Sequence, residues 1–186
     1  MKLKNILLSA ILLTSASVAD DMALKQEGVK YIKMLGGALK TELQAQMKAD
    51  KSGISALGFC TAKANDITND VNKKLPAYAK VRRTSLKVRN SRDNSADALD
   101  EKVMKEYVSS IKAKTFSEKD IKVVKYGDVT RVYKPLLAKK VCLKCHGMNI
   151  SEEIAKATKL SYPQDKAVGF KEGDLRGVVV SEIKKH

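Results

Sequence analysis

The sequence predicts an α+β fold in which two or three helices precede a small, mainly antiparallel sheet. Apolar residues recur every three or four positions over residues 22–71, which is the period of an amphipathic helix. Over residues 121–136, β-branched and aromatic residues instead form two runs separated by Gly127 and Asp128, a pair typical of a hairpin turn. An all-helical fold would leave this turn unexplained.

The helices are expected in the first two thirds of the chain. One is predicted over residues 22–48 and a second over residues 54–71, with Ser52 as its N-cap. Asn94 or Ser95 is expected to cap a third helix. The apolar stripe of the first helix consists of Ile32, Leu35, Leu39, Leu43 and Met47.

The strands are expected around and after the third helix. Residues 80–88 have an extended pattern, and residues 121–136 form the hairpin. Asn149 and Glu152 resemble a capping box at the start of a short helix. Residues 178–183 are β-branched and predict the last strand. Together these strands predict one antiparallel sheet with the early helices packed over it.

The N-terminus has the pattern of an export signal. Two lysines precede an apolar run at residues 6–13, and Ser-Val-Ala at residues 17–19 is a small-x-small cleavage pattern. The run is shorter than the ~20 residues that span a bilayer. We therefore predict that residues 1–19 are a cleaved signal peptide, with an uncleaved anchor as the alternative. Residues 20–186 would then form a single domain in a bacterial periplasm.

Residues 142–146 form the one motif that specifies chemistry, C-L-K-C-H. This is the attachment pattern of haem c, in which both thiols add to vinyl groups and the adjacent imidazole reaches the iron. It predicts one covalently bound haem on Cys142, Cys145 and His146. Two alternatives remain, a redox disulfide between the two cysteines and a zinc site that also uses Cys60. Zinc fits poorly because consecutive Cys145 and His146 would struggle to reach one tetrahedral metal.

The ligand on the other face of the iron is less obvious. Small cytochromes c use a later methionine, but the only one here is Met148, two residues after His146. The only other histidine is the terminal His186. Cys60 is left, either as a ligand or as a small buried hydrophobe on a helix. The upstream methionines are expected to fill the core: Met22, Met34, Met47 and Met104.

Four segments occur in a characteristic order: F-C-T-A-K-A at 59–64, R-T-S-L-K-V-R-N at 83–90, C-L-K-C-H-G at 142–147 and G-D-L-R-G at 173–177. Together they resemble the bacterial PAS-like haem c domain family, a domain of unknown function. The resemblance implies a PAS-like fold over most of the chain, with His146 as the proximal ligand and Cys60 as a distal thiolate. The family often has a proline where this chain has Ser91, which concerns a turn rather than the ligands.

Three basic side chains are candidates to bind the haem propionates. Arg83, Lys87 and Arg89 share one face if residues 80–88 continue as a strand. A guanidinium binds a carboxylate through two hydrogen bonds. The alternative is a solvated strand face. Arg176 is expected to fix a turn or an ion pair instead.

These features predict a periplasmic mono-haem c-type cytochrome that transfers single electrons. A thiolate ligand would lower its reduction potential. The alternative is a haem-based redox or gas (CO/NO) sensor that acts through a separate partner. An enzyme is not expected, because no further acid/base constellation is visible.

The charge of the chain suggests its partners. Lysine and arginine outnumber aspartate and glutamate by 36 to 21, which gives a formal net charge of +15. The basic residues are dispersed and not interleaved with aromatics, so nucleic-acid binding is not expected. The charge favours docking to an acidic redox partner or a peripheral contact with an anionic membrane. The alternative is a well-solvated basic surface without such a partner. A homodimer could pair through residues 22–48.

Overall fold

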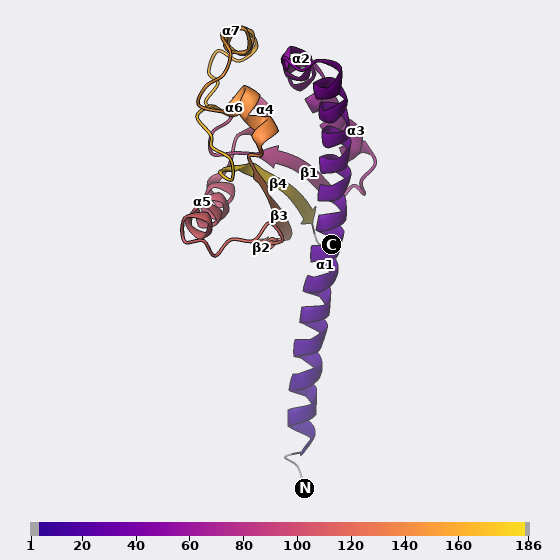
Figure 1. The fold of residues 1–186 in the computed structure, drawn as a ribbon. Helices are drawn as coiled ribbons and strands as arrows, with labels where there is room; N and C mark the ends of the chain where they lie inside the picture. Colours follow the sequence, from indigo (N-terminus) through magenta and orange to yellow (C-terminus); the bar gives the residue numbers. More distant parts are fainter. Residues whose placement is uncertain (1–3, 185–186) are drawn as a thin grey trace.

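A computed structural model describes the backbone of residues 4–184 and the side chains of residues 20–184. It is a four-stranded antiparallel sheet in the order β1-β4-β3-β2. The long helix α1 covers one face of the sheet, with α3 beside it, and α5 covers the other face, while the remaining helices gather beyond one end of the strands (Figure 1). The predicted α+β class is confirmed for these residues. The strands are β1 Ala79–Thr84, β2 Lys122–Tyr126, β3 Val129–Leu137 and β4 Leu175–Lys184.

The predicted hairpin forms as expected. β2 and β3 pair with Tyr126 opposite Val129, so that two residues form the turn. Gly127 lies in the left-handed region at φ 60°, which glycine adopts without a steric penalty. β4 then pairs with both β3 and β1, and this places the last strand of the chain in the middle of the sheet.

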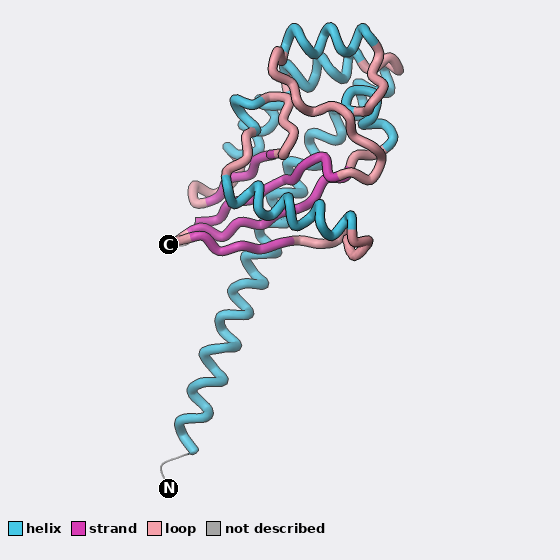
Figure 2. Tube along the Cα trace, turned by 90° about the vertical axis from the view of Figure 1, so that its left-hand side faces the viewer, coloured by secondary structure: helices cyan, strands magenta, loops and turns pink. Residues whose placement is uncertain are grey.

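Helix α1 is longer than predicted and spans Lys4–Ala49. Its backbone continues through the segment predicted to be a signal peptide, but the side chains of residues 1–19 lie outside those described, and cleavage stays a prediction. Beyond the sheet the helix projects from the rest of the molecule (Figure 2). Within the described part of the chain, no helix combines the length and apolar character needed to cross a membrane.

The second predicted helix is two helices, α2 Ile54–Ala62 and α3 Ala64–Lys73. The helical backbone is interrupted at Lys63, where φ is −118°. Amphipathic periodicity continues across this break, so the sequence pattern alone does not show it.

The predicted cap of α2 is wrong. Gly53 is the N-cap residue, at φ 95°, and its left-handed conformation suits a residue without a Cβ. Ser52 instead donates its hydroxyl to Asp50, whose carboxylate also accepts the amide of Ser55 at 2.9 Å. A side chain before the cap thus satisfies an amide of the first turn.

The third predicted helix is α5 Ala98–Lys112, capped by Asp97 rather than by Asn94 or Ser95. The Asp97 carboxylate accepts the amide of Asp100 at 2.9 Å, and Asp100 accepts the amide of Asp97 at 3.2 Å. This reciprocal capping box satisfies two amides at the start of the helix. The remaining short helices are α4 Ser91–Asn94, η1 Lys140–Cys142, α6 Leu143–His146 and α7 Glu152–Ser161, the last capped by Ser151.

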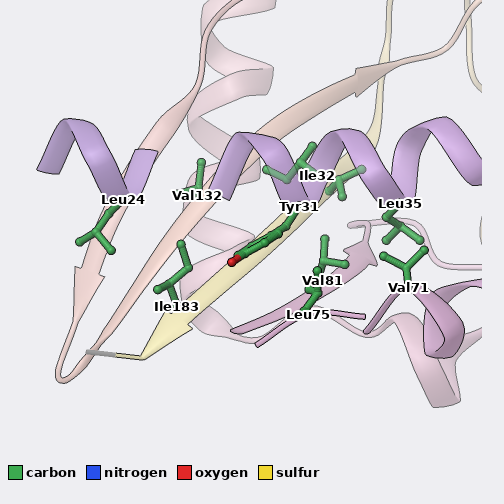
Figure 3. Packing of buried hydrophobic residues seen from close by; sticks show 10 residues of the cluster. Leu24, Tyr31, Ile32, Leu35, Val71, Leu75, Val81, Val132 and Ile183 are labelled. Atoms are coloured by element: carbon green, nitrogen blue, oxygen red, sulfur yellow. The ribbon is translucent and has the colours of Figure 1, made fainter. Parts of the chain in front are cut away.

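Two apolar clusters lie on opposite faces of the sheet, because alternate residues of a strand point to opposite sides. Val132 packs under α1 and Tyr133 packs under α5. Ile32 and Leu35 of α1 are buried in the first cluster, and they therefore offer no surface to a second copy of the chain. Figure 3 shows this cluster, whose labelled members are Leu24, Tyr31, Ile32, Leu35, Val71, Leu75, Val81, Val132 and Ile183.

Candidate functional site

A cavity of about 300 Å³ lies where α1 and α2 meet the end of the sheet and the C-L-K-C-H segment. Cys142, Cys145 and His146 form part of its wall. Cys60 lines the same cavity from α2, although it is far away in the sequence. The structure thus brings together the four residues singled out as attachment and axial ligands.

His146 has a fixed orientation. Its Nδ1 lies 2.6 Å from the carbonyl oxygen of Ala167, so this nitrogen donates a proton to the carbonyl and Nε2 is left as an acceptor. Burial, and then the charges of Arg176 and Arg89, lower the pKa of His146 to about 3. The Phe170 ring packs edge-on against the imidazole at 6.3 Å between centroids. A neutral, oriented imidazole is the form that binds a metal.

The backbone of the motif is held by its neighbours. Arg89 donates to the carbonyl of Cys145 at 2.6 Å and pairs with Asp165 at 3.0 Å. At Gly147 a Cβ would lie 2.5 Å from the carbonyl oxygen of Leu143, so only glycine fits without a shift. The turn after His146 therefore depends on glycine, and Arg89 ties the motif to the loop that follows α7.

The facing wall comes from the end of α1 and from α2. Burial raises the pKa of the Cys60 thiol, although the positive charge of three nearby arginines opposes this. The Tyr162 hydroxyl donates to the Cys60 carbonyl at 3.4 Å. Gly53 brings the start of α2 close to the motif, since a Cβ there would lie 3.9 Å from Sγ of Cys145.

Met47 is a second sulfur ligand candidate on this wall, which the sequence analysis assigned to the core. It projects from the last turn of α1, one turn after Leu43, which also lines the cavity. The predicted alternative His186 lies outside the described residues. The other methionines are placed elsewhere: Met34 and Met104 pack in the two cores, and Met22 and Met148 are 57% and 68% exposed.

Of the three predicted propionate residues, the structure brings Arg83 and Arg89 to the cavity but not Lys87. Strand β1 ends at Thr84, so the alternation expected as far as residue 88 does not continue. The ammonium of Lys87 instead donates to the Val168 carbonyl at 2.5 Å. It also lies 4.7 Å from the centroid of the Phe170 ring.

Arg176 is the cavity residue that sequence reasoning missed. It was expected in a turn or an ion pair, but it lines the cavity and donates to Ser85 Oγ at 3.1 Å. Its guanidinium also lies 5.3 Å from the centroid of the Phe170 ring. Its place in the G-D-L-R-G segment was the available signal, but the sequence could not show that no described carboxylate lies within ion-pair distance of it.

The donor set suits a cofactor that brings its own metal. Within residues 20–184, no three His, Cys, Asp or Glu side chains are grouped as they would be around a bare ion. Cys60, Cys142 and Cys145 are free thiols. Apolar side chains such as Leu57 complete the wall, and the buried Nε of Arg83 has no hydrogen-bond partner. Thiols, an imidazole, apolar walls and spare cationic donors fit the predicted haem.

Comparisons with known proteins agree with this fold. Residues 8–183 match the model of a family described as Tll0287-like. The chain also resembles the solved crystal structure of the cyanobacterial heme-protein Tll0287, with a TM-score of 0.58 and 18% sequence identity. That match covers 93% of this chain and 96% of the other. No curated protein sequence matches.

Proposed function

The chain belongs to the Tll0287-like family, and from this premise we propose that it is a periplasmic c-type cytochrome that carries one covalently bound haem and transfers single electrons. A relative of the same fold is described as a heme-protein, which supports haem binding here. The observation that carries the proposal is the convergence of the C-L-K-C-H motif and Cys60 on one cavity. The cavity lies beside an antiparallel sheet, which is consistent with the PAS-like fold that the resemblance implies.

Each residue of the motif has a separate task. The S–H bonds of Cys142 and Cys145 would add across the two vinyl groups, a step that needs no oxidant because each proton goes to the adjacent vinyl carbon. His146 would bind the iron through Nε2, since Nδ1 is held by Ala167. When bound, the haem iron supplies a centre that accepts and releases one electron.

Cys60 is our proposed ligand on the opposite face. It lines the cavity from α2, where burial raises the pKa of its thiol and the charge of three nearby guanidiniums opposes that shift. Thiolate ligation would hold the reduction potential below that of a His/Met centre. Met47 is the competing ligand, because its thioether lines the same cavity.

A surface beside the cavity supports electron exchange with a partner. Val141 and Leu136 both line the cavity, and they are 53% and 36% exposed. Exposed lysines, Lys139, Lys140 and Lys144, occupy neighbouring positions in the chain. We propose an acidic redox protein as the partner, because opposite charge speeds association. A small apolar contact with exposed lysines near it in the chain, of which Lys139 is paired with Glu118, would bring the partner's cofactor close without tight binding.

The attachment claim is tested on the full chain produced in cells competent in cytochrome c maturation. Pyridine haemochrome analysis should give one covalent haem per chain, and Cys142→Ala/Cys145→Ala should give none. Full-length chain without covalent haem in such cells would end the proposal.

The carrier role is tested separately on the haem-loaded protein. Rapid reversible electron exchange with a small acidic redox protein, slowed by salt, supports it. Stoichiometric CO binding to the reduced protein, coupled to slow electron exchange, would support the sensor instead.

A further inference from the structure

Three arginines surround the cavity, but only one has a carboxylate partner. Arg89 pairs with Asp165 at 3.0 Å, and both side chains are nearly buried. Within residues 20–184, the structure shows no carboxylate within ion-pair distance of Arg83 or Arg176. These two guanidiniums therefore lack a direct ion pair, although the charge of Asp165 acts on Arg176 from beyond ion-pair distance.

Arg83 has an incomplete hydrogen-bond set. Its Nε atom is buried without a partner. Burial lowers the pKa of Arg83, and the interaction with Cys60 is the strongest of those that oppose this shift. A buried donor without an acceptor is energetically unfavourable, and more so when the group is charged. An anionic acceptor inside the cavity would remove this penalty.

Arg176 is held in place without being neutralised. It donates to Ser85 Oγ at 3.1 Å and to the Lys87 carbonyl at 3.4 Å, both uncharged acceptors. Burial, and then the charge of Arg89, lowers the pKa of Arg176 to about 10. The contacts with Ser85 and the ring of Phe170 fix its position, and within residues 20–184 no carboxylate forms an ion pair with it.

Arg89 has a different task from the other two. One of its nitrogens binds the Cys145 carbonyl, and the same guanidinium pairs with Asp165. Its charge is thus matched, and its hydrogen bonds are directed at the backbone of the attachment motif. It is a positioning residue.

We propose that Arg83 and Arg176 together bind the two carboxylates of the haem, and that neither Lys87 nor Arg89 does. This inference rests on the proposed function. A haem carries two propionate groups, and the cavity supplies two guanidiniums that have no carboxylate of their own. Guanidinium is the side chain best matched to a carboxylate, because its fork donates two parallel hydrogen bonds.

The haem-loaded full chain tests the proposal through the propionate-bending modes of its resonance Raman spectrum. These modes report hydrogen bonding to the haem carboxylates and do not depend on activity. Arg83→Met and Arg176→Met should each shift a propionate band, while Arg83→Lys and Arg176→Lys should partly restore its position. Lys87→Met should leave both bands in place. Arg92→Met is the matched control, since its side chain is 86% exposed.

A second readout on the same variants is the pH, on raising it, at which the reduction potential begins to fall as a haem carboxyl loses its proton. A cation near a carboxylate lowers its pKa by about one to three units, so Arg83→Met and Arg176→Met should move this pH upward by a similar amount. The Arg92→Met protein should titrate like the wild type. Covalent haem content, measured first, confirms that each variant is loaded.

The outcomes separate the two levels of the argument. If no haem is attached to the wild-type chain, the proposed function fails. If haem is attached but the propionate bands and titration of Arg83→Met and Arg176→Met match the wild type, this inference fails alone. If Arg83→Met alters only the thiolate signature of Cys60, Arg83 serves the thiolate and the two-arginine assignment is overturned.

Discussion

Arg82 and Arg83 are neighbours in strand β1, yet their side chains enter opposite surroundings. Arg82 points toward α5, where it donates to Asp100 at 2.8 and 3.0 Å and to Glu182 at 2.8 Å. Arg83 points into the cavity, where no carboxylate lies within ion-pair distance among the described side chains. The carboxylates of the fold neutralise Arg82, whereas Arg83 can still donate hydrogen bonds to an anionic ligand.

The partner network of Arg82 extends across the sheet. Asp100 is fully buried and also accepts from Tyr133 at 3.1 Å and from Arg131 at 3.3 Å. Arg131 has an Nε without a good hydrogen bond, as Arg83 does, but its guanidinium lies between Asp97, Asp100 and Glu182. Arg82 and Arg131 on one face of the sheet have carboxylate partners, whereas Arg83 on the other face has none among the described side chains. The first set of charges therefore stabilises the fold, and Arg83 is available to bind a ligand.

The largest expected effect comes from removing the centre of the network. Asp100→Ala leaves Arg82 and Arg131 with fewer counterions in a partly buried site, and we expect a loss of about 3–5 kcal/mol in the free energy of unfolding. Urea unfolding followed by circular dichroism measures this loss. An unfolding midpoint equal to that of the wild type would show that the network around Asp100 does not contribute to the free energy of unfolding.

The direct comparison is Arg82→Met against Arg83→Met in the haem-loaded protein. Arg82→Met should cost about 2–3 kcal/mol, because Asp100 loses a paired guanidinium. Arg83→Met should cost less than Arg82→Met, because no protein carboxylate is left unpaired and Arg176 still faces the haem carboxylates. The same urea experiment ranks the two. Equal losses, or the reverse order, would contradict the division between the two faces.

A smaller effect is expected at Asp97, which caps α5 at the edge of the network. Although burial opposes it, hydrogen bonds from the Asp100 amide and from Arg131 lower the pKa of Asp97. At a pH above 3.8, the pKa of this carboxyl in the unfolded chain, its charged form stabilises the fold in full. This stabilisation is lost as the pH falls through the lower pKa that the carboxyl has in the folded protein.

Asp97→Ala should therefore cost about 1 kcal/mol at neutral pH, the usual size of a lost cap. The difference from the wild type should shrink as the pH falls below about 4. Urea midpoints at pH 7 and at acid pH measure both effects. If the stability difference between Asp97→Ala and the wild type were the same at both pH values, the charge of Asp97 would not be its cause, and lost packing would be.

The sequence was sufficient for features that depend on local pattern. The hairpin at Gly127, the amphipathic period of α1 and the C-L-K-C-H motif each depend on a few adjacent residues. The α2–α3 break and the caps at Gly53 and Asp97 were missed, because periodicity does not report a local φ or which of several polar residues caps.

Site features that depend on tertiary contacts were harder to predict. The role expected for Lys87 required a strand that continued to residue 88, but β1 ends at Thr84. Met47 and Arg176 reach the cavity because α1 ends there and β4 begins there. The placement of Cys60 on this wall agrees with the family resemblance, whereas helical spacing alone also allowed an ordinary core position.

The most direct test of the account is the electron paramagnetic resonance spectrum of the oxidised, haem-loaded full chain, recorded for the wild type, Cys60→Ala and Met47→Leu. We expect a low-spin thiolate signature in the wild type and in Met47→Leu, and its loss in Cys60→Ala. Met47→Leu is the matched control because both side chains line the same wall. An unchanged spectrum in Cys60→Ala, or loss of the signature in Met47→Leu, would contradict His146/Cys60 ligation.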